Sequence, residues 1–167
     1  MYLKKLFGIL DFGKSRESLR KVLPLWEIVE DVAVLIRLKL EQSRVRLQVN
    51  HRSDGIKVSV EKGQLQQALL NLILNAVVAM PDGGLLEIET DRTENDKARI
   101  TIKDTGSGIP DEFRERIFDS FLSGREEGTG LGLAISKRIL RGHDGDLELV
   151  ESGSEGTVFS LTLPLSH

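Results

Sequence analysis

The chain has 167 residues, of which 29% are charged and 40% hydrophobic, as expected for one soluble globular domain with a short appendage. A net charge of −3 gives no electrostatic basis for nucleic acid as the main ligand, and the lack of cysteine excludes disulfides, zinc–thiolate sites and thiol catalysis. No apolar run reaches transmembrane length and the N-terminus lacks a signal-peptide core, so we expect an intracellular domain or a piece of a longer protein.

The N-terminal third is predicted to contain helices and two short strands. Residues 1–22 mix apolar and basic residues at helical spacing, although two glycines weaken that helix. Residues 45–50 and 56–60 alternate like half-buried strands joined by a turn at 53–55. Between these segments, residues 26–45 form an amphipathic helix pattern, with apolar positions at Trp26, Val29, Ala33, Ile36 and Leu40.

The strongest helix pattern covers residues 61–80. After it, residues 85–90 and 98–104 alternate as two strands of a hairpin, linked by the charged loop 91–97. The helix has a core stripe at Leu65, Leu69, Leu72, Ala76 and Met80, with Ala68, Ile73 and Val77 beside it.

The remaining chain predicts two helices and a closing pair of strands. A short helix is expected at 111–122 and another at 131–142, separated by a mobile, glycine-containing segment. Residues 146–152 and 156–165 alternate as strands. We therefore predict an α+β two-layer sandwich, a mixed, mostly antiparallel sheet of about five strands with about three helices on one face.

The stretch ITIKDTGSGIP delivers Asp104 into a turn with Gly106 and Gly108. An aspartic protease would need two such aspartates, but only one Asp-Thr-Gly occurs, and the chain is about half helical. A dinucleotide fingerprint needs a third glycine where Asp111 stands, and the carboxylates of Asp111 and Glu112 would repel a pyrophosphate. A simple turn remains open on this stretch alone.

Two other segments suggest a ligand. Asn71 and Asn75 lie one turn apart on an apolar helix, and their carboxamide oxygens suit a hard cation such as Mg²⁺, although either could instead bond a neighbouring loop. In GTGLGLAISK, Gly130 and Gly132 lead into a helix whose free N–H groups would favour a phosphate. This segment is not a Walker P-loop, and it could equally be a flexible loop before a close-packed helix start.

Taken in this order, the motifs resemble those of the catalytic ATP-binding domain of sensor histidine kinases, in the superfamily of gyrase, Hsp90-type chaperones and mismatch-repair ATPases. The matching motifs are QALLNLILNAVVAM, DTGSGIP, IFDSFL, GTGLGLAI and GTVFSLTLP, over residues 26–165. The resemblance implies the Bergerat-type ATP-binding fold. It also implies a two-component function, transfer of the γ-phosphoryl group of Mg-ATP to a histidine on a separate dimerisation helix.

The resemblance also implies roles for individual residues. Asn75 would coordinate Mg²⁺, with Asn71 assisting at the metal and the phosphates. Asp104 would accept a hydrogen bond from the adenine exocyclic amine, with Thr157 supporting it through water. Other residues would lie near the base (Gly106, Gly108, Ile109), wrap the phosphates (Gly128, Thr129, Gly130, Leu131, Gly132, Leu133), anchor the lid (Phe118, Phe121) or contact phosphate from the lid (Arg125). The two glycines near the base would let the backbone pass close to it.

Two positions bear on the branch of the superfamily. Hydrolysing members usually have a glutamate where this chain has Asn71, which cannot take a proton, so a kinase is favoured. Val78 replaces a frequent lysine, and the segment between Phe121 and Gly128 is short. Both features resemble the nitrogen-regulation and zinc-responsive branch, with Arg125 as the candidate cation.

The phosphoacceptor is not predicted within this chain. Its three histidines, His51, His143 and His167, do not lie on a helix in the family's setting. Residues 1–22 resemble the end of the dimerisation hairpin or a linker, and residues 23–167 the catalytic domain. We expect a monomeric, cytoplasmic fragment of a homodimeric parent, whether or not that parent is membrane-anchored. Its partners would be the histidine-bearing domain and a response regulator, without nucleic acid.

Two alternative functions remain at this stage. One is a nucleotide-sensing or anti-sigma-type regulatory module that uses the same pocket without transferring phosphate. The other is a serine kinase acting on a regulator, which Asn71 disfavours.

Overall fold

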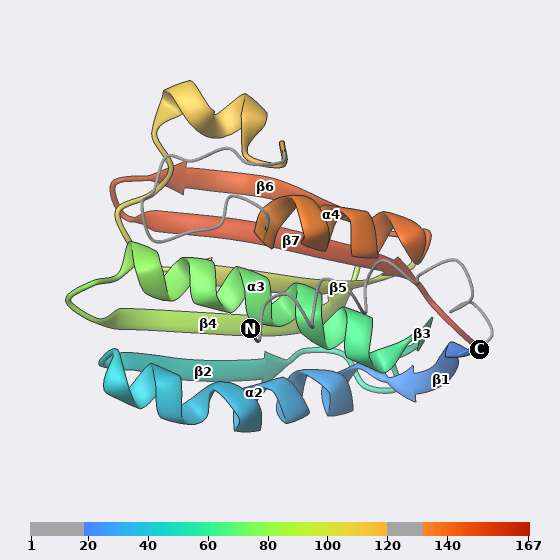
Figure 1. Ribbon diagram of the computed structural model, residues 1–167. Coiled ribbons are helices and arrows are strands. Elements are labelled where there is room, and N and C mark those ends of the chain that lie inside the picture. The colour runs from blue at the N-terminus through green and yellow to red at the C-terminus, as the bar shows by residue number, and fades with distance from the viewer. Residues whose placement is uncertain (1–18, 120–131) are drawn as a thin grey trace.

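A computed structural model describes residues 19–119 and 132–167 and shows the predicted two-layer sandwich (Figure 1). Three helices lie on one face of a five-stranded sheet, and a separate pair of short strands flanks it. In chain order the elements are β1 Lys21–Pro24, α2 Leu25–Gln42, β2 Val45–His51, β3 Lys57–Val60, α3 Lys62–Ala79, β4 Gly84–Arg92, β5 Lys97–Asp104, the 3-10 helix η2 Asp111–Arg116, α4 Gly132–Gly142, β6 Asp146–Gly153 and β7 Gly156–Pro164.

The sheet has the strand order β2-β4-β5-β7-β6. The β4–β5 and β6–β7 hairpins are confirmed, and only β2 runs parallel to its neighbour, β4. Strands β2 and β3, which are joined through the predicted turn at 53–55, do not pair with each other, because β3 pairs with β1, a strand that the sequence did not predict. Alternation along a strand encodes which face is buried, and it carries no information on the partner strand.

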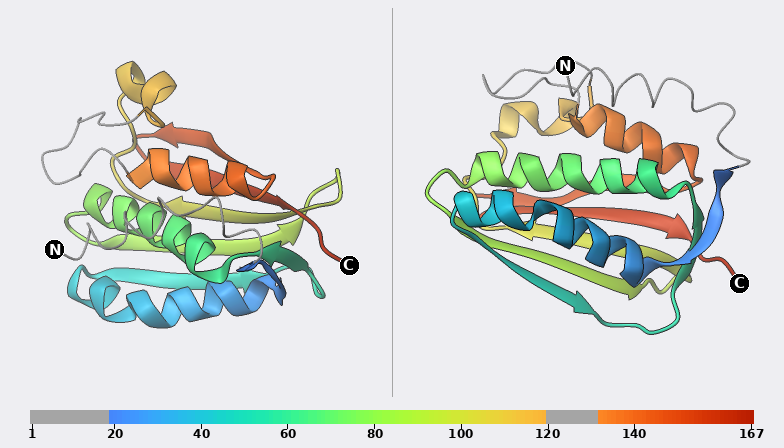
Figure 2. Two further views of the ribbon diagram at one scale, coloured as in Figure 1. Left: turned by 45° about the vertical axis from the view of Figure 1, so that its right-hand side comes forward. Right: turned by 60° about the horizontal axis from the view of Figure 1, so that its bottom comes forward.

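Helix α3 occupies the middle of the helical layer, between α2 and α4 (Figure 2). Its predicted core stripe is confirmed, since all five stripe residues are at most 2% exposed. The Glu61 side chain caps its first turn by accepting hydrogen bonds from the backbone N–H groups of Gly63 and Gln64. Ser136 of α4 donates a buried hydrogen bond to the Ala68 carbonyl, 3.1 Å away, so α3 and α4 are joined closely.

Helix α2 is confirmed, but its buried stripe begins one residue earlier than expected. Leu25 is fully buried, whereas Trp26 is 53% exposed. At about 100° per residue, Trp26 falls beyond the edge of the arc that Ile28, Val32 and Ile36 direct at the sheet. A tryptophan in step with an apolar repeat therefore lies outside the core.

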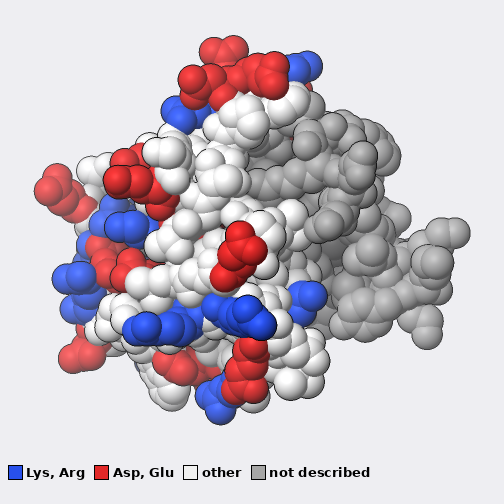
Figure 3. Space-filling model, turned by 90° about the vertical axis from the view of Figure 1, so that its left-hand side faces the viewer, with Lys and Arg blue, Asp and Glu red and all other residues white. Residues whose placement is uncertain are grey.

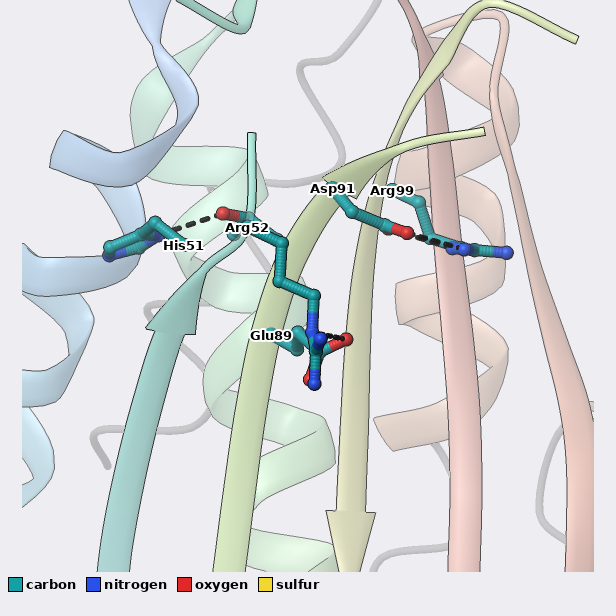
Figure 4. Close-up of polar contacts among 6 residues, drawn as sticks. His51, Arg52, Glu89, Asp91 and Arg99 are labelled. Atoms are coloured by element: carbon teal, nitrogen blue, oxygen red, sulfur yellow. Dashed lines mark hydrogen bonds and ion pairs between the residues drawn. The ribbon is translucent and has the colours of Figure 1, made fainter. Parts of the chain in front are cut away.

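The inner face of β5 explains how Asp104 reaches the interior. Ala98, Ile100 and Ile102 point at the helices and are at most 2% exposed, and Asp104 is the next residue in the same alternation. The opposite face of the sheet is polar and carries ion pairs, including Arg99 with Asp91 on β4 (Figure 4). The strand therefore ends with a carboxylate on the side of the core.

Strand β6 contains an irregularity that affects its final residues. Its pairing with β7 shifts register between Leu149 and Glu151, so Val150 is an extra residue and is 60% exposed. This is a β-bulge, which reverses the side that later residues face. Beyond it, Ser152 pairs with Thr157 and points inward.

Candidate functional site

The carboxylate of Asp104 is held by backbone N–H groups. Asp104 is only 5% exposed, and its Oδ1 accepts hydrogen bonds from the backbone N–H groups of Gly106 at 2.8 Å and Thr157 at 3.2 Å. Asp104 on β5 and Thr157 on β7 are direct register partners. The carboxylate is thus fixed by the main chain at the end of the sheet, where a ligand can use it as an acceptor.

The glycines after Asp104 are required by contacts within the protein. A Cβ on Gly106 would lie 2.6 Å from the Ala79 carbonyl oxygen, and Gly108 has a φ of +82° beside the backbone of Gly153. The loop packs between the end of α3 and the β6–β7 turn, and the predicted role of both glycines, space for a base, stays a prediction. Gly156, which the sequence did not single out, has a φ of +136° and lies against the Asp104 carbonyl.

A buried hydroxyl pair lies behind this loop. Ser152 Oγ accepts a hydrogen bond from Ile109 N at 2.7 Å and lies 2.9 Å from Thr157 Oγ1. Arg114 of η2 also donates to the Ser152 carbonyl. Ser152 was missed from the sequence because a serine near a strand end has no diagnostic spacing, and the only signal was its place beside the Gly153–Gly156 turn.

The two predicted asparagines lie on one stripe of α3. Asn71, Asn75 and Ala79 are one turn apart, about 6 Å per step along the axis. At one end Asn71 Nδ2 donates to the Gly132 carbonyl at 3.3 Å, and at the other end Ala79 contacts Gly106. A single helix stripe therefore connects the start of α4 with the Asp104 loop.

The side chain of Asn71 bonds a neighbouring segment of the protein, which was the alternative to a role in binding a cation. Besides its bond to Gly132, its Oδ1 accepts a hydrogen bond from Gln67 Nε2 at 2.6 Å. Asn75 is half-buried on the same stripe, and Val78, where the family often has lysine, is 36% exposed. The metal roles of both asparagines stay predictions.

The described residues contain no group of three or more His, Cys, Asp or Glu side chains placed to hold a metal. The predicted Mg²⁺ ligands are carboxamides, which do not belong to that set. Their oxygens are hard donors, and Mg²⁺ accepts few protein ligands when phosphate and water supply the others. The donor chemistry of Asn71 and Asn75 therefore fits this ion.

Of the predicted lid anchors, Phe118 is described. Its ring packs edge-on against Phe159 with the two centroids 6.4 Å apart, and Lys137 Nζ lies over the Phe118 ring, 4.8 Å from its centroid. Lys137 also bonds Asp146 at 2.8 Å, linking α4 to β6. Burial raises the pKa of the Asp146 carboxyl, but hydrogen bonds from Lys137 and the Leu147 N–H, with the nearby positive charges, outweigh it and lower the pKa.

The helix predicted at 111–122 is shorter and tighter than expected, a 3-10 helix over Asp111–Arg116. Gly132 and Leu133 begin α4 as predicted. Six other predicted site residues lie outside the described part of the chain: Phe121, Arg125, Gly128, Thr129, Gly130 and Leu131.

The end of the molecule that carries the β6–β7 turn shows charged side chains of both signs (Figure 3). Acidic side chains gather at the top of this view, where Figure 1 places η2 with Asp111 and Glu112. On the described part of this face, positive and negative charges are therefore interspersed.

The ring nitrogens of His51 and His143 form hydrogen bonds within the protein. His51 lies at the end of β2 (Figure 4), and its ring bonds Thr90 Oγ1 at 2.7 Å and Glu30 Oε1 at 2.9 Å. His143 is buried between α4 and α3, accepting the Glu61 N–H at Nε2 and lying 2.8 Å from the Ile139 carbonyl through Nδ1. Burial lowers the pKa of His143, so the neutral ring is favoured.

None of the helices that the structure describes has the combined length and apolarity needed to cross a bilayer.

Comparison with known proteins agrees with this architecture. A family model described as "Histidine kinase-, DNA gyrase B-, and HSP90-like ATPase" matches residues 60–167. The chain is 38% identical over 161 residues to sporulation kinase C of Bacillus subtilis, covering 96% of the chain and 37% of that protein. It is 33% identical over 163 residues to AtoS of Escherichia coli, a signal transduction histidine-protein kinase, covering 98% of the chain and 27% of that protein.

Solved structures show the same fold. The catalytic domain of the histidine kinase ThkA is 28% identical with a TM-score of 0.77, over 87% of this chain and 95% of that one. ThkA in complex with the response regulator TrrA gives 26% identity and a TM-score of 0.75, over 88% and 42%. The chain spans 25% to 37% of the length of three curated relatives. The described fold, its site and these matches show that the chain belongs to the family of histidine kinase-, DNA gyrase B- and HSP90-like ATPases.

Proposed function

We propose that this chain is the catalytic part of a sensor histidine kinase, which binds Mg-ATP and transfers its γ-phosphoryl group to a histidine on a separate dimerisation helix. The observation that carries the proposal is the α3 stripe, which runs from Gly132 at the start of α4 to Gly106 beside Asp104. A nucleotide is an elongated ligand with a base at one end and phosphates at the other. The stripe provides different chemistry at its two ends.

The strand end of the stripe suits the base. Asp104 is a buried acceptor, held by two backbone N–H groups, and it would accept a hydrogen bond from the adenine exocyclic amine. Thr157 is its register partner and would support the contact through water. Gly106, Gly108 and Ile109 form the adjoining loop.

The helix end of the stripe suits the phosphates. Gly132 opens α4, where first-turn N–H groups lack helical partners and the helix dipole favours anions. Residues 128–133 would wrap the phosphates. Asn75 would hold Mg²⁺ with Asn71 assisting, and the bound ion would supply positive charge for the phosphate oxygens.

The described residues favour transfer to an external acceptor over hydrolysis. Asn71 stands where a hydrolase has a general base, and its Oδ1 already accepts a hydrogen bond from Gln67. The work of the protein is then to position the phosphoryl group and balance its charge.

The acceptor would come from a histidine-bearing dimerisation domain. His51 and His143 each contact two neighbours through their ring nitrogens. A response regulator would be the next recipient, in line with the complex of ThkA with TrrA. The parent would be a homodimer acting in the cytoplasm, and this fragment alone a monomer.

A finer placement concerns the branch of the family. Val78 in place of lysine and the short segment from Phe121 to Gly128 support the nitrogen-regulation and zinc-responsive branch. Arg125 would then supply a cation at the phosphates.

Calorimetric titration with Mg-ATP tests the binding site. Asp104→Ala should weaken ATP binding by about tenfold or more, because a buried charged acceptor is lost. Asp91→Ala removes an aspartate from the outer sheet face and should leave binding unchanged. Equal ATP affinity in Asp104→Ala and the unmodified chain would show that the adenine assignment is wrong.

A transfer assay tests the reaction. The histidine-bearing hairpin of a related kinase is supplied in trans with labelled ATP, and acid-labile, alkali-stable phosphate should appear on it. The same hairpin with its histidine replaced by alanine is the control. ATP binding without any transfer to several such hairpins would instead favour the nucleotide-sensing module.

A further inference from the structure

The hydroxyl pair Ser152–Thr157 lies directly beside the proposed base pocket. Thr157 binds the Asp104 carboxylate through its backbone N–H, and its side chain lies 2.9 Å from Ser152 Oγ. Both residues are buried, Ser152 at 6% and Thr157 at 4% exposure. In such a setting the direction of each hydroxyl hydrogen is determined by the available partners.

The bulge in β6 is what brings Ser152 into this position. Leu147 and Leu149 face the core, and a regular strand would continue with Glu151 inward and Ser152 outward. The extra residue Val150 reverses the alternation, so Ser152 faces inward opposite Thr157. A one-residue irregularity at a site thus selects a hydroxyl in place of a carboxylate.

The backbone N–H of Ile109 gives the hydroxyl pair a direction. That N–H can only donate, so Ser152 Oγ accepts from it at 2.7 Å. If Thr157 also donated to Ser152, the Ser152 hydrogen would need a third partner, and the described residues show none. Ser152 therefore donates to Thr157 Oγ1, which leaves the Thr157 hydrogen for another acceptor.

We propose that Ser152 is a positioning residue that holds the Thr157 hydroxyl as a hydrogen-bond donor toward N1 of adenine, directly or through one water. This inference rests on the proposed function. The edge of adenine that carries the amine also carries N1, an acceptor, so an Asp104 acceptor beside a Thr157 donor matches that edge. Hypoxanthine and guanine present the reverse pattern, an oxygen acceptor and an N1–H donor, so the Ser152–Thr157 pair selects adenine.

The test compares ATP with 1-deaza-ATP, in which N1 is replaced by a C–H group, by calorimetry with Mg²⁺. The unmodified chain should bind 1-deaza-ATP about fivefold more weakly than ATP, the effect of one hydrogen bond. In Ser152→Ala, Thr157 is no longer held as a donor, and the two nucleotides should bind within about twofold of each other. In Ser152→Ala, the difference between the affinities for ATP and inosine triphosphate should also become smaller.

Ser160→Ala is the matched control, because Ser160 lies on the outer sheet face of the same hairpin and its loss should keep the fivefold ratio. Ser152→Cys retains a weak donor of similar size and should give an intermediate ratio. If Ser152→Ala does not fold, Thr157→Val serves instead, because it removes the other hydroxyl at nearly constant volume. It should likewise bring the affinities for ATP and 1-deaza-ATP to within about twofold of each other.

Three outcomes are distinct. If Ser152→Ala weakens the binding of ATP and 1-deaza-ATP equally, so that the fivefold ratio of their affinities persists, Ser152 is only structural and the inference is overturned. The same holds if the unmodified chain does not distinguish ATP from 1-deaza-ATP. If the unmodified chain binds no ATP at all, the proposed function itself fails.

Discussion

The two ends of the α3 stripe, the proposed base end at Asp104 and the proposed phosphate end at Gly132, are held by different kinds of interaction. At the base end, Asp104 is fixed by backbone N–H groups and by the β5–β7 register. At the phosphate end, Asn71 reaches Gly132 through a single side-chain hydrogen bond of 3.3 Å between two helices. Strand register can change only in steps of whole residues, whereas packed helices can slide by small amounts.

The difference separates two tasks. Reading a base requires fixed donors and acceptors, which the sheet supplies through its ladder. Phosphoryl transfer requires that the phosphate contacts re-form in each cycle, and contacts between helices can do so. We therefore expect a replacement at the base end to disturb that end as a whole, and a replacement at the phosphate end to change single contacts.

The largest expected effect is at the base end. Gly156→Ala would place a Cβ against the Asp104 carbonyl at a φ of +136°, so the free energy of unfolding should fall by about 3 kcal/mol, measured by urea denaturation. Gly142→Ala is the matched control, because its Cβ would meet nothing within 4 Å, and it should be neutral or slightly stabilising. A small loss in Gly156→Ala would mean that this backbone is less constrained than the strand register suggests.

The next effect concerns how the helices are joined. His143→Ala removes the hydrogen bond from the Glu61 N–H at the start of α3 and the contact with the Ile139 carbonyl of α4, and it should cost about 2 kcal/mol of unfolding free energy at pH 7.5. Because burial lowers the folded pKa of His143 below its usual value of 6.5, the unfolded chain binds more protons as the pH falls below 6.5. The difference in stability between the two proteins should therefore shrink toward acid pH, and a constant difference would contradict this role.

A smaller effect is expected when Asn75 is replaced, and it should distinguish binding of the phosphates from binding of the base. Asn75→Ala should weaken Mg-ATP binding by about tenfold and leave adenosine binding unchanged, because the base end does not depend on it. Leu74→Ala, at an exposed neighbouring position, is the control. Parallel losses for ATP and adenosine would indicate that Asn75 supports the whole pocket.

The smallest effect tests the contact between α3 and α4. Ser136→Ala removes the buried bond to the Ala68 carbonyl and should cost about 1 kcal/mol of stability, measured by thermal denaturation. ATP should then bind slightly more weakly and adenosine as before. An equal change for both ligands would show that the two ends are not independent.

The sequence predicted best what depends on periodicity. The α3 stripe and both hairpins follow from spacing and turn residues, because one face of each element must be buried. It failed where a partner had to be chosen, since β2 joins β4 in parallel and β3 joins β1. Trp26 shows that a repeat in step with a helix is not sufficient to assign burial.

For the candidate site, the sequence predicted roles for Asp104 and Thr157, which the structure places opposite each other, but it did not predict the reasons for their neighbours. Gly106 and Gly108 were expected to make room for a base, and the contacts that require them lie in Ala79 and Gly153. Ser152 depends on a bulge, which changes no composition and little spacing. Such features arise from tertiary packing and are therefore absent from local patterns.

The same bulge also bears on how the molecule behaves at high concentration. Strand β6 is an edge of the sheet, and a straight edge is a template for pairing with another chain. Val150 interrupts the regular ladder there, and Glu148 and Glu151 add negative charge on either side. The residue that brings Ser152 inward should therefore also discourage edge-to-edge aggregation, so that solubility and the proposed selection of adenine would both depend on one inserted residue.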